Sequence, residues 1–187
     1  MTISKSIKFK NSYAKELSEI CERCTPHGFN KSEIVLKNFI LAKELGLSKK
    51  FVESNECLEI FSGVSLPDSS QPIAQGYCGH QFGHFNPQLG DGRAVLLGEI
   101  NNKDIQLKGI GQTPFSRRGD GKSSLGPVLR EYIVSEFMHS IKIPTTRALF
   151  ALKTNETVMR ETEQFGGVLT RVAKSHIRIG TFEYARS

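Results

Sequence analysis

Two glycines, Gly90 and Gly92, flank a single acidic residue directly before the apolar run 94–100, and this pattern strongly constrains how the centre of the chain can fold. Glycine allows positive φ and a close approach of the backbone to a ligand. The apolar run is typical of a strand that positions such a turn. Arg93, between the turn and the strand, adds a fixed positive charge. We therefore expect a glycine turn with a cation at the start of a strand.

A second strand and a helix are expected after this turn. Lys108 ends the run 104–108, in which apolar residues alternate, so its side chain faces away from its apolar neighbours and can enter a cleft. The segment 123–141 has apolar residues at helical spacing, and Pro127 suits the first turn of a helix. Glu131 lies in this helix and can supply the carboxylate that a lysine in a cleft requires.

A glycine turn, a strand lysine and a helix glutamate, in this order, are the parts with which protein kinases hold nucleotide phosphates. A nucleotide is therefore the first ligand to consider. Each part alone also has an ordinary interpretation: glycine turns connect hairpins, strand lysines are solvated, and helix glutamates lie on surfaces. It is the conjunction that favours a nucleotide.

The remaining pattern predicts the fold class. Segments 146–153, 156–160 and 167–173 have strand-like composition with turn residues between them. Strand, strand, helix and then further strands indicate an α+β fold, an antiparallel sheet with a packed central helix. Arg171 lies in the last of these strands and Arg178 just beyond it, and guanidinium groups are suited to phosphate.

Additional helices are expected near the N-terminus. Apolar spacing predicts helices over 11–24, over 32–45 with Ser32 as cap and Gly46 as stop, and over 55–61, followed by a loop over 62–71.

Net charge and composition narrow the class of partner. The formal charge of +6 suits an anionic ligand or an acidic partner. Nucleic acid is disfavoured because tryptophan is absent and aromatic residues do not interleave with the basic ones. A solvated basic face is the alternative for the cluster around the turn 119–121, which comprises Arg117, Arg118, Lys122 and Arg130.

Localisation follows from what the sequence lacks. It contains no apolar run near the length of a membrane span and no secretory signal, so a cytoplasmic protein without membrane contact is expected. The four cysteines are then expected to be reduced.

Two motifs have the spacing of metal ligands. Cys21 and Cys24 have no second pair, so burial as small apolar residues is favoured over zinc binding or a redox role. His80 and His84 stand four residues apart, but Gly79 and Gly83 weaken a helix there. Structural histidines that donate to backbone carbonyls are favoured.

The chain resembles the selenoprotein O family of protein adenylyltransferases, which have a kinase-like fold. The resemblance extends over nearly the whole chain from about residue 8. The motifs that carry it are Asn11-Ser-Tyr-Ala14, Gly79-His-Gln-Phe-Gly-His84, Pro87-Gln-Leu-Gly-Asp-Gly-Arg93, Leu107-Lys-Gly109, Thr113-Pro-Phe-Ser-Arg-Arg-Gly-Asp-Gly121, Leu129-Arg-Glu-Tyr132, Val168-Leu-Thr-Arg171 and Arg178-Ile-Gly-Thr-Phe-Glu183.

The resemblance implies that ATP binds in a flipped orientation and that AMP is transferred to a Ser, Thr or Tyr hydroxyl of a protein. It assigns catalysis to Lys108, which contacts phosphates, and to Glu131, which orients that lysine. Arg171 and Arg178 are expected to clamp the γ-phosphate. The nucleotide is expected to be lined by Gly90, Gly92, Arg93, Asp120 and Gly121.

Family members are much longer than this chain. Their further part resembles a kinase large lobe, with the aspartate base and the ligands of Mg²⁺ or Mn²⁺. We therefore expect an N-terminal portion with a helical extension over 1–75, a nucleotide-binding small lobe over 76–187, no metal ligands and no large lobe. Such a chain is expected to be inactive alone. A non-catalytic module that binds a nucleotide or a partner is the alternative.

Overall fold

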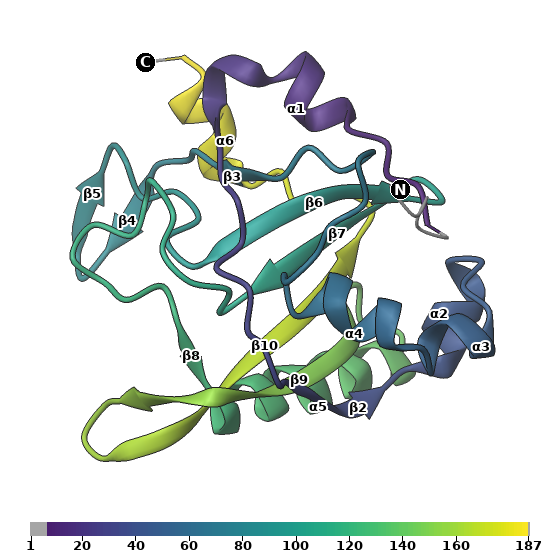
Figure 1. The fold of residues 1–187 in the computed structure, drawn as a ribbon. Coiled ribbons are helices and arrows are strands. Elements are labelled where there is room, and N and C mark those ends of the chain that lie inside the picture. Colours follow the sequence, from purple (N-terminus) through teal and green to yellow (C-terminus); the bar gives the residue numbers. More distant parts are fainter. Residues whose placement is uncertain (1–6, 187) are drawn as a thin grey trace.

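The computed structural model describes residues 7–186, and its centre is an antiparallel sheet (Figure 1). The strands are β1 (Cys21–Arg23), β2 (Glu33–Lys37), β3 (Ile73–Gln75), β6 (Ala94–Ile100), β7 (Lys103–Lys108), β8 (Ser123–Ser124), β9 (Arg147–Met159) and β10 (Glu163–Ala173). Their order is β1-β3-β6-β7-β10-β9-β2, with β8 paired to β10. Strands β4 (Gly79–Gln81) and β5 (His84–Asn86) form a separate hairpin.

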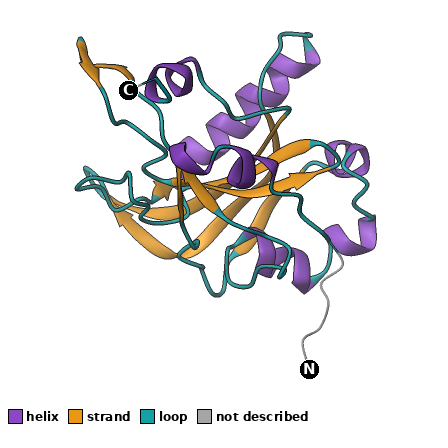
Figure 2. Ribbon diagram, turned by 90° about the horizontal axis from the view of Figure 1, so that it is seen from above, coloured by secondary structure: helices purple, strands orange, loops and turns teal. Residues whose placement is uncertain are grey.

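The helices are α1 (Ser12–Glu16), α2 (Phe39–Glu44), α3 (Lys49–Val52), α4 (Asn55–Phe61), α5 (Leu125–Ser140) and α6 (Ile179–Tyr184), with a short 3₁₀ turn, η1 (Ser18–Ile20). Helix α5, the longest, lies on one side of the sheet (Figure 2). This arrangement confirms the predicted α+β class with an antiparallel sheet and a packed central helix. The likeness to a kinase small lobe stays a prediction.

The two faces of the sheet are buried by different elements. On one face, Leu107 of β7 and Val168 of β10 belong to the main core, together with the apolar residues of α2, α3 and α4. On the other face, Leu169 of β10 packs with Val128 of α5 in a smaller cluster. Because side chains alternate along a strand, the face that meets α5 also receives Lys108 and every second residue of its neighbours. The fold thus directs those polar side chains towards α5.

The second predicted helix, 32–45, is wrong over its first half. Residues 33–37 form β2, which pairs with β9, and only α2 is helical. The apolar spacing fits both structures, but residues 34 and 35 are β-branched and suit a strand. Ser32 is not the cap, because its hydroxyl donates to the carbonyl of Phe29. Asn38 caps α2 by accepting from the amide of Leu41 at 2.9 Å. Gly46 ends the helix with φ +77°.

Of the other predictions for the N-terminal segment, the last helix and the loop are confirmed and the first helix is largely wrong. Helix α4 coincides with the predicted 55–61, and 62–71 contains no helix or strand. The helix predicted over 11–24 is only the single turn of α1 followed by η1 and β1. Strands β1, β2 and β3 of this segment belong to the central sheet. The domain boundary after residue 75 stays a prediction.

Two predicted strands, 146–153 and 156–160, are one long strand, β9. It forms an antiparallel pair with β10 that extends beyond the rest of the sheet, and the tip of this pair projects from the molecule (Figure 1). The end of β9 thereby comes close to the loop that follows β7, a contact that bears on the site below.

Among residues 7–186, no helix combines the length and the apolar character needed to cross a bilayer.

Candidate nucleotide site

Lys108, Arg171 and Glu131 form one ion-pair cluster between the sheet and α5. Lys108 Nζ lies 2.6 Å from Glu131 Oε2, and Arg171 Nε lies 3.3 Å from Glu131 Oε1. Burial lowers the pKa of Lys108, whereas its hydrogen bond and charge interaction with Glu131 oppose that shift. Burial likewise lowers the pKa of Arg171, against the attraction of Glu131. One carboxylate therefore holds two partly buried cations in place.

Strand register explains how the three residues meet. Arg171 of β10 lies directly opposite Gln106 of β7, so Arg171, Gln106 and Lys108 share one face of the sheet. Glu131 approaches that face from α5, whose first turn contains Pro127 as predicted. Three elements that are distant in sequence thus bring one carboxylate and two cations together.

A buried polar network continues from Arg171 to the glycine turn. Arg171 Nη1 donates to Gln106 Oε1 at 2.7 Å, and Gln106 Nε2 donates to Asp91 Oδ2 at 2.9 Å. Gln106 is fully buried and Asp91 is 3% exposed. Burial raises the pKa of Asp91 to about 6, against the attraction of Arg178 and Arg171. The carboxylate between the two glycines therefore fixes the turn from inside the protein.

The glycine turn itself is shaped by Phe115. Gly90 has φ +63°, and a Cβ there would lie 2.1 Å from the ring of Phe115. Gly92 does not have positive φ, contrary to our expectation, but a Cβ there would lie 2.9 Å from the carbonyl oxygen of Phe115. Close packing requires both glycines, and positive φ requires only the first.

These residues surround a cavity of about 400 Å³. Its lining residues are Tyr77, Leu89, Gly90, Asp91, Gly92, Arg93, Ala94, Lys108, Phe115, Ser116, Arg117, Gly119, Asp120, Gly121, Lys122, Arg160, Arg171 and Arg178. Seven of them are lysine or arginine and two are aspartate, so the cavity is strongly cationic. A volume of this size falls within the range of small-molecule sites. The cavity suits an anion with several charges.

Two arginines of the cavity are available to an incoming anion. Arg178 stacks over the ring of Tyr77, with 4.8 Å from its guanidinium carbon to the ring centroid. Arg93 Nη1 lies 3.5 Å from Ser123 Oγ. Within residues 7–186, neither arginine has a carboxylate within 4.0 Å. An unneutralised guanidinium is a strong ligand for phosphate.

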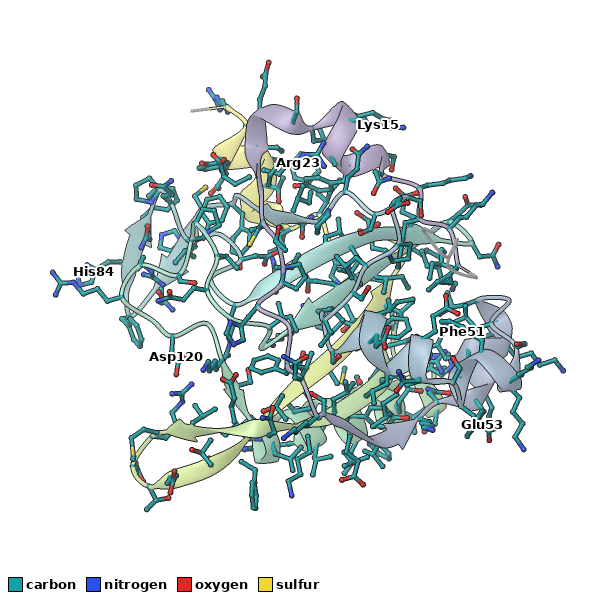
Figure 3. The ribbon with its side chains drawn as sticks, in the orientation of Figure 1. Lys15, Arg23, Phe51, Glu53, His84 and Asp120 are labelled. Carbon is teal, nitrogen blue, oxygen red and sulfur yellow. The ribbon has the colours of Figure 1, made fainter. Side chains whose placement is uncertain are left out.

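The remaining wall of the cavity is the loop 115–122 (Figure 3, near Asp120). Gly121 has φ +67°, and a Cβ there would meet the carbonyl oxygen of Gly111 at 2.0 Å, so only glycine fits. Asp120 forms an ion pair with Arg160 at 2.8 Å. The hydrogen bond from Arg160 lowers the pKa of Asp120.

The structure brings all nine predicted site residues to one place. Eight line the cavity, and Glu131 lies behind two of them. Sequence reasoning missed Tyr77, Gln106 and Arg160 entirely. Asp91 stands within the glycine motif and could have been found there. Arg160 was expected only as the end of a strand, and no local pattern marks it.

The structure does not support metal binding by the histidine pair or by the cysteine pair. His80 and His84 lie on opposite faces of the β4–β5 hairpin, because His80 pairs with Phe85 and Gln81 with His84. The expected bonds to backbone carbonyls are not found for these rings in the part of the chain that the structure describes; His80 instead stacks edge-on against Phe85. Cys24 is buried as expected, and Cys21 is half-buried in β1. Within residues 7–186, no three His, Cys, Asp or Glu residues cluster as metal ligands would.

A cationic cavity with a lysine–glutamate pair and a glycine turn defines the class: an α+β protein with a site suited to an anion of several charges. Comparison with known proteins gives the family. The family model described as "Protein adenylyltransferase SelO" matches residues 4–187, and the chain belongs to this family. Its curated relatives are nucleotidyltransferases by name.

Three such relatives are each named protein nucleotidyltransferase YdiU. The chain is 54% identical over 180 residues to that of Methylorubrum extorquens strain PA1, 53% over 182 residues to that of Anoxybacillus flavithermus, and 55% over 181 residues to that of Bradyrhizobium sp. strain ORS 278. These alignments cover 94–95% of this chain but only 36–38% of each relative. The chain therefore spans little more than a third of the length of these relatives.

Proposed function

We propose that this chain is the ATP-binding part of a cytoplasmic protein adenylyltransferase, which transfers AMP from ATP to Ser, Thr or Tyr hydroxyls of proteins. The observation that carries the proposal is the cavity into which Lys108, Arg171 and Arg178 converge, with Glu131 holding the first two. The nucleotidyl transfer known by name for the family supports it.

The charges suggest how a triphosphate would lie. Arg171 and Arg178 both line the cavity and both attract the buried Asp91, so we assign the terminal phosphate to these two guanidinium groups. We place the other phosphates beside Lys108, between these two arginines and the glycine turn, where its ammonium group neutralises them. Cations that are already positioned by the fold stabilise charge in the transition state without further reorganisation.

The α-phosphorus then faces the acceptor. The acceptor hydroxyl oxygen forms a bond to the α-phosphorus, while the bond from that phosphorus to the bridging oxygen breaks and pyrophosphate leaves. The hydroxyl proton passes to a base. In-line geometry requires that both the nucleotide and the acceptor are held in place.

The described residues do not fit as the site of Mg²⁺ or Mn²⁺. Asp120 is paired with Arg160, Asp91 is buried against Gln106, and no third ligand stands near either of them in the described part of the chain. We propose that the metal ligands and the base belong to the portion of the relatives that this chain does not span. The chain alone should then bind ATP weakly and transfer AMP negligibly.

The experiment compares α-labelled with γ-labelled ATP, in the presence of Mg²⁺ and a test protein. A full-length relative should label the protein from α-labelled ATP only. This chain should label it from neither. Transfer of the γ-label would indicate phosphoryl transfer instead. Robust α-labelling by the chain alone would show that its own residues provide the base. Absence of ATP binding to the chain would favour a partner-binding module.

A further inference from the structure

We propose that Arg160 is a positioning residue, which holds the loop 115–122 in place as a wall of the cavity by fixing Asp120. The inference about loop order stands on geometry alone. Its consequence for ATP affinity rests on the proposed function. Arg160 directly follows β9, which ends at Met159, and is far along the chain from the loop that it contacts.

Arg160 uses four hydrogen bonds to join the two segments. Its Nη1 donates to Asp120 Oδ2 at 2.8 Å and to the carbonyl oxygen of Met159 at 2.8 Å. Its Nη2 donates to Asp120 Oδ1 at 3.2 Å and to the carbonyl oxygen of Lys122 at 3.0 Å. A bidentate pair of this kind fixes both partners in orientation. The guanidinium therefore ties the loop backbone and the loop carboxylate to the end of β9.

A second connection lies beside the first. Lys122 Nζ lies 2.5 Å from Glu156 Oε2, and His27 Nε2 lies 3.1 Å from Glu156 Oε1. Glu156 lies near the C-terminal end of β9, and Arg160 directly follows that end. The loop is thus held by two side-chain bridges to this end of β9, in addition to the backbone hydrogen bond from the Gly111 amide to the Gly121 carbonyl at 3.0 Å.

The hydrogen bonds of Arg160 indicate that it positions the loop and does not bind phosphate directly. Both terminal nitrogens of Arg160 are engaged within the protein, whereas the guanidinium of Arg178 stacks on the ring of Tyr77. Asp120 accepts from Arg160 and from the amide of Lys122 at 2.9 Å. Pairing also offsets the negative charge of Asp120, which would otherwise repel a polyphosphate in the cavity. Both features assign Arg160 to the loop, and its effect on the ligand passes through Asp120.

The pair is too exposed to contribute much to global stability. The side chains of Arg160 and Asp120 are 37% and 44% exposed, and exposed ion pairs of this kind contribute little to the free energy of unfolding. Its effect should instead appear in local opening of the loop, which native-state amide exchange measures residue by residue.

The test uses the 187-residue chain and four variants. Arg160→Ala removes the bridge, and Arg160→Lys keeps the charge without the bidentate geometry. The double variant Asp120→Arg with Arg160→Asp rebuilds the pair in reverse. Arg23→Ala is the matched control, because Arg23 is exposed, lies outside the loop and does not line the cavity. Amide exchange at Gly119 and Lys122 is measured without ligand, and ATP affinity by calorimetry.

In Arg160→Ala we expect exchange at these amides to accelerate roughly tenfold and ATP affinity to fall severalfold. Arg160→Lys should show an intermediate effect on both. The reversed pair should restore slow exchange at Gly119, whose amide donates to the Ser116 carbonyl, but not at Lys122, whose amide loses its acceptor Asp120 Oδ1. Arg23→Ala should change neither quantity. Unchanged exchange in Arg160→Ala would overturn the proposal, and with a loss of ATP affinity it would make Arg160 a direct ligand. If the unaltered chain binds no ATP, the proposed function fails, and the exchange data still decide the role of Arg160.

Discussion

At the scale of single residues, Glu131 is central to the site, because its carboxylate forms ion pairs with both Lys108 and Arg171. Burial and the neighbouring Arg171 and Arg93 lower the pKa of Lys108, and only Glu131 raises it. Loss of that carboxylate should therefore release a more reactive, less protonated amine.

We expect Glu131→Gln to increase the rate at which Lys108 is acylated at pH 8, by roughly tenfold for each unit by which its pKa falls. Labelling of the individual lysines can be followed by mass spectrometry. Glu161→Gln, which changes an exposed glutamate outside the cavity, is the control and should leave the rate unchanged. An equal rate at Lys108 in both variants would mean that Glu131 does not control this lysine.

Asp91 makes the free energy of unfolding depend on pH, and its raised pKa fixes the sign of that dependence. Its pKa in the folded protein is about 6, raised by burial above the ordinary value of 3.8. Between these values the folded protein binds the proton more strongly than the unfolded chain does. The contribution of Asp91 to the free energy of unfolding is therefore fully present below about pH 4 and is lost as the pH rises through 6.

We expect Asp91→Asn to remove this loss, because an amide oxygen can still accept from Gln106 and carries no charge to bury. The difference in free energy of unfolding between the variant and the unaltered protein should increase by about 2 to 3 kcal/mol, in favour of the variant, from pH 4 to pH 7. Urea titrations at several pH values measure it. A difference that does not vary with pH would contradict a buried, titrating Asp91.

At the scale of elements, α5 is positioned by a second glutamate. Glu136 accepts from Arg147 Nη2 at 2.8 Å, from the amide of Ala148 at 2.9 Å and from Asn38 Nδ2 at 2.8 Å. It thereby fastens α5 to the start of β9 and to the cap of α2. Its pKa is lowered, because the hydrogen bonds from Arg147 and Ala148 outweigh the effect of burial.

We expect Glu136→Gln to destabilise the protein by about 2 to 3 kcal/mol, since it leaves the largely buried Arg147 without its main partner. Glu53→Gln is the comparison, because Glu53 forms only an exposed pair with Lys49 at 3.9 Å and should cost less than about 0.5 kcal/mol. Denaturant unfolding measures both. Similar losses for the two variants would show that α5 does not depend on this anchor.

The elements also show what the sequence alone could predict. Strand β6 and helix α5 were predicted closely because a long apolar run and a long periodic segment each favour one structure. Segment 32–45 was not, because its apolar spacing suits a strand as well as a helix and the pairing of β2 with β9 decided between them. The β-branched residues 34 and 35 are the local signal for a strand, and the pairing itself has none.

At the scale of the whole molecule, strand register assembles the site. The predicted residues that precede β6 and those of β7, α5 and β10 come together because β7 lies between β6 and β10 and α5 packs against β9 and β10. The order of these residues along the chain indicated that they act together, but it did not give the distances between their side chains. Arg160 and Gln106 enter the site only through this topology, so no motif could have revealed them.

The central claim is that the cavity binds a triphosphate through Lys108, Arg171 and Arg178. Calorimetric titration of the chain with ATP and with AMP tests it most directly. Arg178→Ala is the decisive variant, because Arg178 forms no ion pair within residues 7–186 and its loss should leave the fold intact; Arg118→Ala is the control.

We expect ATP to bind at least about tenfold more tightly than AMP, and Arg178→Ala to remove most of that difference, since charge-assisted bonds to phosphate contribute about 1.5 to 3 kcal/mol. The control should preserve the difference. Equal affinities for ATP and AMP in the unaltered chain, or a difference that survives in Arg178→Ala, would contradict the account.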